Sequence, residues 1–171
     1  MYEGLSHDLA EAIRSGYALR NRNDMAPTIR FFEQLLEQYP NNAVVRYELA
    51  GAHDSAGHEQ QARELYEQAL QQGLSGEPLR RCLCQYASTL RWLGELDASR
   101  AILEQARAQF PNSEGVKVFS ALTSLEAGQT DAAVGELLEV ITAHHGHTDL
   151  GRWSDGLASL GRWLKDGRLN T

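Results

Sequence analysis

The chain has 171 residues, of which 42% are hydrophobic, and a formal net charge of -7 at pH 7. This acidic balance, with an isoelectric point near 5.3, argues against nucleic acid as a partner, because basic side chains that neutralise phosphates supply most non-specific affinity. No apolar run approaches the roughly 18 residues of a membrane-spanning helix, so no membrane association is expected.

The start of the chain and its cysteines bear on the compartment. The first residues, MYEGLSHDLAEAI, lack the basic stretch and the apolar run of a secretory signal. Cys82 and Cys84 would point to nearly opposite sides of a helix, which makes a disulfide between them implausible and fits a reducing compartment. We therefore expect a cytoplasmic protein.

Hydrophobic periodicity predicts helices along the whole chain and no strands. Ser6 and Asp24 are candidate N-caps, and Pro27 falls in a first helical turn, where its missing N–H costs little. The expected helices lie near residues 6–21, 25–39, 43–56, 59–72, 78–93, 96–109, 114–127, 130–144 and 149–166. The fold class predicted from this pattern is all-α.

A unit of about 34 residues recurs four times, starting at Leu9, Ala43, Arg80 and Glu114. Repetition at this period indicates stacked helical hairpins. The predicted repeats cover residues of about 9–42, 43–79, 80–113 and 114–147, and a short insertion lies in GLSGEPLRR between the second and the third. We expect these repeats and a final helix near 149–166 to form a single solenoid domain over residues 1–171.

Each unit carries the same kinds of residue at fixed positions. Small residues stand where the two helices of a hairpin would cross, because only small side chains let helix axes approach closely. These are Gly16, Ala50, Ala87 and Ala121 on the first helices, and Thr28, Ala62, Ser99 and Ala133 on the second. The turn position holds residue types that accept a left-handed backbone, namely Asn23, Gly57, Gly94 and Gly128.

This pattern resembles the tetratricopeptide repeat family over residues 9–145. The resemblance is strongest in the second and third units, in YELAGAHDSAGHEQQARELYEQAL and YASTLRWLGELDASRAILEQA. The outer units depart from the family, since Asn23 replaces the turn glycine and Ser120 and Ser124 replace larger residues. The resemblance implies a right-handed α-α superhelix, a TPR-like solenoid of four helical hairpins, in which the first helices line a concave groove.

The groove positions of this family meet ligand, and in this chain they combine aromatic residues with arginines, a composition enriched at binding hot spots. The predicted partner-binding residues are Tyr17, Arg20, Tyr47, Asp54, Arg81, Arg91 and Trp92. The hypothesis is that a segment of another protein, carrying carboxylates, lies along them. The alternative is that Tyr47 and Trp92 pack into neighbouring hairpins.

An apolar stripe at three- and four-residue spacings follows the fourth unit. It consists of Leu150, Trp153, Leu157, Leu160 and Leu164. One interpretation is a capping helix that closes the end of the repeat array. The other is a homodimer seam, because the spacing also fits heptad packing. The residues that would form such a seam are Trp153, Leu157, Leu160 and Leu164.

No recognisable catalytic motif is present, neither a phosphate-cradling glycine loop nor a nucleophile elbow. His144, His145 and His147 form an HHGH cluster, but no nearby cysteine or acidic residue has the spacing to complete a metal site, and His53 and His58 are interpreted as packing and surface residues. We expect no enzyme activity, metal or cofactor. The predicted function is a protein-interaction scaffold, or alternatively a homo-oligomeric structural protein that associates through its terminal helix or groove.

Overall fold

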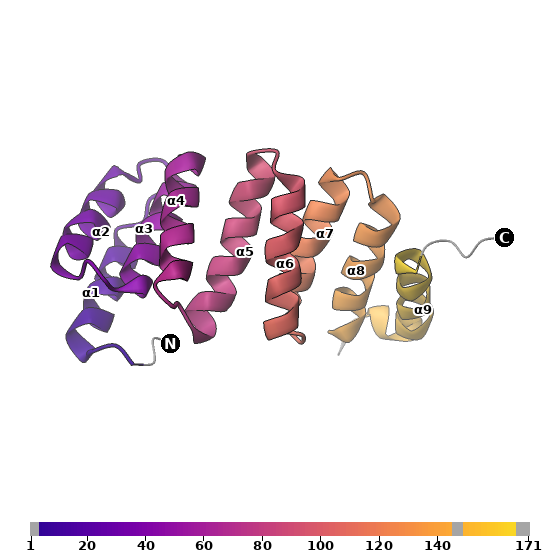
Figure 1. Cartoon of the computed structure of the whole chain (residues 1–171). Helices are drawn as coiled ribbons and strands as arrows, with labels where there is room; N and C mark the ends of the chain where they lie inside the picture. Colours follow the sequence, from indigo (N-terminus) through magenta and orange to yellow (C-terminus); the bar gives the residue numbers. More distant parts are fainter. Residues whose placement is uncertain (1–3, 145–148, 167–171) are drawn as a thin grey trace. The chain divides into compact units, whose positions relative to one another are not determined.

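The computed structural model describes residues 4–144 and 149–166, and every regular element in them is helical, which confirms the all-α prediction (Figure 1). The elements are α1 (His7–Ala18), α2 (Ala26–Gln38), α3 (Ala43–Ser55), α4 (Glu59–Gln71), α5 (Gly76–Trp92), α6 (Leu96–Gln109), α7 (Glu114–Glu126), α8 (Thr130–Ala143), the 3-10 helix η1 (Asp149–Trp153) and α9 (Ser154–Lys165). They divide into two compact units, Met1–Gly94 and Glu95–Thr171. The single solenoid domain stays a prediction.

In the first unit, consecutive helices pack against one another from α1 to α5, and α3 also contacts α5. The core that α1, α2 and α3 enclose consists of Leu9, Ile13, Met25, Ile29, Phe32, Leu35, Val45, Leu49 and Ala52. Gly16 marks the α1–α2 crossing, because a Cβ there would lie 2.5 Å from Cζ of Phe32. The absence of a side chain at Gly16 therefore permits the close approach of the two helices.

The prediction of small residues at the helix crossings is confirmed in both units. All eight positions are buried. In the second unit the buried pair Ser99 and Thr123 adds a hydrogen bond of 3.0 Å between α6 and α7. Small side chains therefore make these crossings. The polar side chain of Ser99 has a partner there, whereas the buried hydroxyl of Thr28 has no hydrogen-bond partner among the described residues.

The predicted helix starts are confirmed at Ser6 and Pro27 and corrected at Asp24. Ser6 caps α1 by accepting a hydrogen bond from the N–H of Leu9 at 3.3 Å. The N-cap of α2 is Met25 rather than Asp24, although the Asp24 carboxylate still accepts a hydrogen bond from the N–H of Ala26 at 3.1 Å. Pro27 lies in the first turn of α2 as predicted.

The turn glycines are confirmed at three of the four predicted positions. Gly57, Gly94 and Gly128 have φ values of 76°, 78° and 75°, in the left-handed region that other residues avoid. Among the described residues no non-glycine residue has a positive φ, so Asn23 does not take this conformation. The turn after α1 is braced instead by Asn21, whose side chain accepts a hydrogen bond from the N–H of Asn23 at 3.0 Å.

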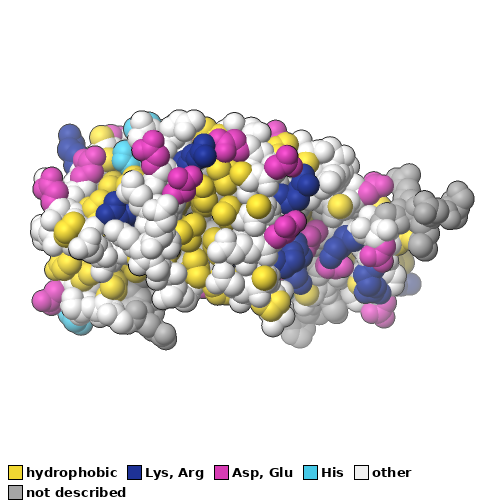
Figure 2. All heavy atoms as spheres, in the orientation of Figure 1, with side chains coloured by type: hydrophobic (Ala, Val, Ile, Leu, Met, Phe, Trp, Pro, Cys, Tyr) yellow, Lys and Arg dark blue, Asp and Glu magenta, His cyan; other side chains and the backbone are white. Residues whose placement is uncertain are grey.

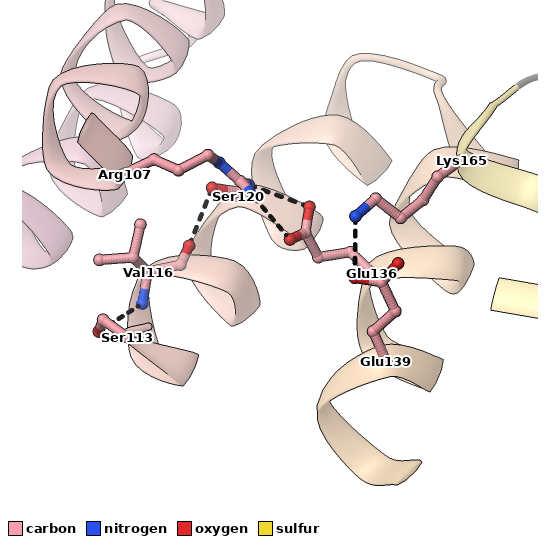
Figure 3. A network of polar contacts seen from close by, with 7 residues as sticks. All are labelled: Arg107, Ser113, Val116, Ser120, Glu136, Glu139 and Lys165. Carbon is pink, nitrogen blue, oxygen red and sulfur yellow. Dashed lines mark hydrogen bonds and ion pairs between the residues drawn. The ribbon is translucent and has the colours of Figure 1, made fainter. Parts of the chain in front are cut away.

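In the second unit, ion pairs link helices across α8. Arg107 of α6 donates two hydrogen bonds to the Glu136 carboxylate, at 2.9 and 3.0 Å, and Lys165 of α9 donates one to Glu139 at 2.9 Å (Figure 3). The Glu136 side chain is only 10% exposed and that of Arg107 is 41% exposed, so the pair is partly shielded from water, and its bidentate geometry fixes the orientation of the two groups. On the face shown in Figure 2, Lys and Arg side chains lie beside Asp and Glu side chains over these helices.

The fourth repeat has a pocket where the sequence departs from the family pattern. Ser120 and Ser124 of α7 line a cavity of about 170 Å³ together with residues of α6 and α8. Serine side chains are too small to fill the space that larger residues would occupy. The departure noted in the sequence thus appears as a cavity.

The ninth predicted helix is divided. Residues Asp149–Trp153 form η1, and α9 begins only at Ser154. α9 packs on α8 through two glycines, since a Cβ on Gly161 would lie 2.9 Å from the carbonyl oxygen of Gly135. Among the described residues, no helix combines the length and the apolar character that crossing a membrane would require.

Candidate functional site

Tyr17 and Arg20 lie together at the end of α1. The Arg20 guanidinium carbon is 4.6 Å from the centroid of the Tyr17 ring, a cation–π contact. Arg20 also reaches across to α3, where its Nη2 would lie 3.1 Å from a Cβ on Gly51. Glycine at position 51 therefore leaves the space beside α3 that the guanidinium occupies.

Asp54 joins α3 to the next two helices. Its carboxylate accepts hydrogen bonds from Thr89 of α5 at 3.0 Å and from the Tyr66 hydroxyl of α4 at 3.5 Å. Burial raises the pKa of Asp54, and the two hydrogen bonds and the Arg20 charge oppose that rise. Asp54 is thus a structural connector as well as a partly exposed carboxylate.

Tyr47 lies in the interior, which supports the alternative reading of this residue. It is 3% exposed, and its ring centroid is 6.3 Å from that of Tyr66, which in turn lies 6.0 Å from that of Tyr86. Burial raises the pKa of Tyr47 far above its ordinary value. A residue enclosed in this way offers almost no surface to a partner, so we do not retain Tyr47 as a contact residue.

Arg81 is held at the N-terminal end of α5. Its Nε donates to the Glu77 carboxylate at 2.8 Å, and Arg80 donates to the same carboxylate through Nε at 2.8 Å. Hydrogen bonding to Arg80, with a further contribution from Arg81, lowers the pKa of Glu77 to about 2. The hydrogen bond to Glu77 likewise raises the pKa of Arg81, and burial opposes this shift.

Trp92 is the most exposed large hydrophobic side chain described, at 68%. The Arg91 guanidinium carbon lies 5.1 Å from the centroid of its ring, and Arg91 also donates to the Ser88 hydroxyl at 3.5 Å. The packing alternative therefore does not hold for Trp92. We call Tyr17, Arg20, Arg81, Arg91 and Trp92 the arginine–aromatic face.

The structure adds polar groups that the groove pattern did not single out. Thr89 bonds to Asp54, and the Oε1 atom of Gln85 is buried without a hydrogen-bond partner among the described residues, as is Nε of Arg20. Gln85 Nε2 would lie 3.9 Å from a Cβ on Gly51, close to the Arg20 guanidinium. Thr89 and Gln85 both lie on α5, and neither stands at a groove position of the repeat.

The residues predicted for self-association lie on α9 and just before it. Trp153 is 61% exposed and Leu160 is 44% exposed, whereas Leu157 and Leu164 are half-buried. Packing of α9 on α8 therefore covers only part of the apolar stripe. Leu150 and Trp163 add further exposed apolar surface to this end of the unit.

No group of three or more potential metal ligands occurs in the part of the chain that the structure describes. His144 contacts the Glu114 carboxylate, while His145 and His147 of the HHGH cluster lie outside the described residues. Cys82 and Cys84 are buried free thiols, and burial raises their pKa values to about 12 and about 11. Thiols with such high pKa values are poor nucleophiles near neutral pH.

Comparison with known families agrees with the repeat pattern. A family model described as tetratrico peptide repeat matches residues 43–153, and a second, described as tetratricopeptide repeat, matches residues 13–42. No curated protein matches the chain. The first match alone covers more than half of the sequence. The helices within it lie close to the predicted ranges, with Gly57, Gly94 and Gly128 at the turns between them. The chain belongs to the tetratricopeptide repeat family.

Proposed function

We propose that the first unit is a non-catalytic module that binds a segment of a partner protein on the arginine–aromatic face. Tetratricopeptide repeats generally mediate protein–protein interaction. The observation that carries the proposal is Trp92, a large apolar ring left 68% exposed with the Arg91 guanidinium over it. The exposed ring offers a large apolar surface to a partner, and tryptophan is among the residue types most enriched at binding hot spots.

The chemistry of the face favours an acidic segment. Trp, Tyr and Arg are the residue types enriched at binding hot spots. Arg20 and Arg91 are each held over an aromatic ring, so their side chains lose less conformational freedom when a carboxylate binds. A segment that presents carboxylates beside an apolar side chain would meet both kinds of group on this face.

The experiment is a comparative capture from the native host lysate. The bait proteins are the wild type, a double variant Arg91→Glu and Trp92→Ala, and the matched control Arg30→Glu, which reverses the charge of an exposed arginine on α2. We expect a partner that the wild type and the control retain and the double variant loses. Retention of the same proteins by all three would contradict the proposal.

The affinity of the purified partner for the wild type and for Trp92→Ala then measures how much Trp92 contributes to binding. Truncation of a hot-spot tryptophan costs about 2 kcal/mol, which corresponds to about a thirtyfold loss of affinity. We expect Trp92→Ala to show a loss of this order, while its melting temperature stays near that of the wild type because the ring is exposed.

A second candidate function is self-association through the terminal helix. It is favoured by the exposed apolar surface of Trp153 and Leu160. Sedimentation velocity over a range of protein concentrations tests it, with Trp153→Asp and Leu160→Asp as variants. A dimer that these variants dissociate would support the second candidate, and a monomer at all concentrations would contradict it.

A further inference from the structure

Two imidazole rings meet at the turn between α3 and α4. His53 lies in the last turn of α3, and His58 is the N-cap residue of α4. Their Nδ1 atoms are 3.2 Å apart, and their ring centroids are 5.5 Å apart. Both side chains reach the surface, and in Figure 2 histidine side chains lie at the surface beside an acidic one.

The backbone of the turn fixes this pair. His58 donates its N–H to the carbonyl of His53 at 3.0 Å, and Gly57 donates its N–H to the carbonyl of Asp54 at 3.1 Å. With Gly57 at a φ of 76°, these bonds form a Schellman motif. In this motif the side chains at the positions of His53 and His58 lie close together. In other proteins these two side chains often make a hydrophobic contact. The two rings are therefore positioned before any ligand arrives.

An equivalent turn in the second unit serves as an internal comparison. Between α7 and α8, Gln129 donates its N–H to the carbonyl of Ser124 at 2.8 Å, and Gly128 donates to Leu125 at 3.0 Å. The side chains in the two corresponding positions are Ser124 and Gln129, which are not good ligands for transition metals. The α3–α4 turn thus has the same backbone motif as the α7–α8 turn, but the two side chains in these positions are imidazoles.

The separation of the two nitrogens suits one cation held between them. Zinc binds histidine nitrogen at about 2.0–2.1 Å, so two nitrogens at a tetrahedral angle lie about 3.3–3.4 Å apart. The observed 3.2 Å is close to this value. Without a cation, one Nδ1 can donate its proton to the other. With a cation, both rings would carry their proton on Nε2 and turn a lone pair inward.

The charges around the pair are compatible with a bound cation. Neutral imidazole is the form that binds metal. The nearby Glu33 charge and the net charge of -7 attract cations to this surface.

We infer that Nδ1 of His53 and Nδ1 of His58 form a binding site for a divalent transition-metal ion of the Zn²⁺, Ni²⁺ or Cu²⁺ class. These ions accept imidazole ligands readily. The described residues provide no group of three ligands, so the remaining coordination positions are open to water or to a donor atom of another molecule. The site lies at the turn and is independent of the arginine–aromatic face.

The test is calorimetric titration of the metal-free full chain with Zn²⁺. To remove competing imidazoles, the parent protein carries His144→Gln, His145→Gln and His147→Gln. The variants are His53→Gln, His58→Gln and both together, and the matched control is His7→Gln, which removes an exposed histidine from α1. We expect saturable binding of one ion by the parent and by the control, at least a tenfold loss in each single variant, and no binding by the double variant.

A second readout separates binding from folding. Zn²⁺ should raise the melting temperature of the parent protein but not that of His58→Gln, whose melting temperature without metal should match that of the parent because His58 is exposed. Equal zinc binding by the parent and the double variant would overturn the inference. Saturable binding by the wild type that disappears once His144, His145 and His147 are replaced would overturn it as well.

Discussion

Ala62 shows what a single residue contributes to a helix crossing in this protein. It lies on α4 and is fully buried. We expect Ala62→Glu to lower the free energy of unfolding by at least about 3 kcal/mol, because the carboxylate would enter the crossing without a partner. Thermal melting followed by circular dichroism measures the loss.

The control for this prediction lies two residues earlier on the same helix. Gln60 is exposed, so Gln60→Glu adds the same carboxyl group to α4 without burying it. We expect the melting temperature of Gln60→Glu to stay near that of the wild type. If Ala62→Glu melted like Gln60→Glu, the assignment of Ala62 to the crossing would be wrong.

The lowered pKa of Glu77 predicts that the free energy of unfolding depends on pH in the acid range. Its pKa is lowered from 4.5 to about 2 by hydrogen bonds to Arg80 and Arg81. The folded-state pKa lies below the unfolded-state value, so the unfolded chain binds the proton first as the pH falls. The stabilisation is therefore complete above about pH 4.5 and is lost as the pH falls toward 2.

The measurement for Glu77 is urea unfolding of the wild type and of Glu77→Gln between pH 6 and pH 2. We expect the wild type to be the more stable protein above pH 4.5, with a difference that shrinks toward zero near pH 2. A difference that stayed constant over this range would show that the ion pairs with Arg80 and Arg81 do not cause it.

At the scale of elements, the packing of α9 on α8 depends on one of two glycines within α9. A Cβ on Gly161 would lie 2.9 Å from the Gly135 carbonyl oxygen and 3.2 Å from Cβ of Leu138, whereas a Cβ on Gly156 would meet nothing within 4 Å. We expect Gly161→Ala to destabilise the protein by about 1–3 kcal/mol through overpacking. Gly156→Ala should stabilise it by about 0.5–1 kcal/mol through helix propensity.

Chemical unfolding of the two variants beside the wild type measures both effects. Because the substitutions are identical and lie on the same helix, their opposite signs would isolate the contact with α8. Equal effects of the two substitutions would contradict close packing at Gly161.

The sequence predicted the helices well because hydrophobic spacing and turn glycines are local signals. The bounds of α3, α4 and α6 to α8 agree with the expected ranges within a residue. The start of α9 was not predicted, because the division between η1 and α9 depends on packing rather than on a local breaker. The N-cap of α2 was misplaced by one residue, since both Asp24 and Met25 precede the helix and only backbone geometry decides between them.

At the scale of the molecule, the family and its repeat pattern could be read from the sequence, but the exposure of individual side chains could not. Tyr47 and Trp92 both occupy groove positions of the repeat, yet Tyr47 lies beside Tyr66 inside the first unit and Trp92 lies at the surface. Repeat position indicates a helix face, while burial depends on the neighbouring helix. The contact between His53 and His58 was likewise missed, because it arises from the geometry of the turn.

The most direct test of the central claim, that the arginine–aromatic face binds a partner protein, is site-specific photocrosslinking in the native host lysate. A photoreactive phenylalanine analogue replaces Trp92 in one protein and Arg30 in the other, so that one probe lies on the face and the other on α2. We predict a discrete crosslinked partner from position 92 that is absent from position 30 and disappears when Arg91→Glu is added. No crosslink from position 92, or the same products from both positions, would contradict the claim.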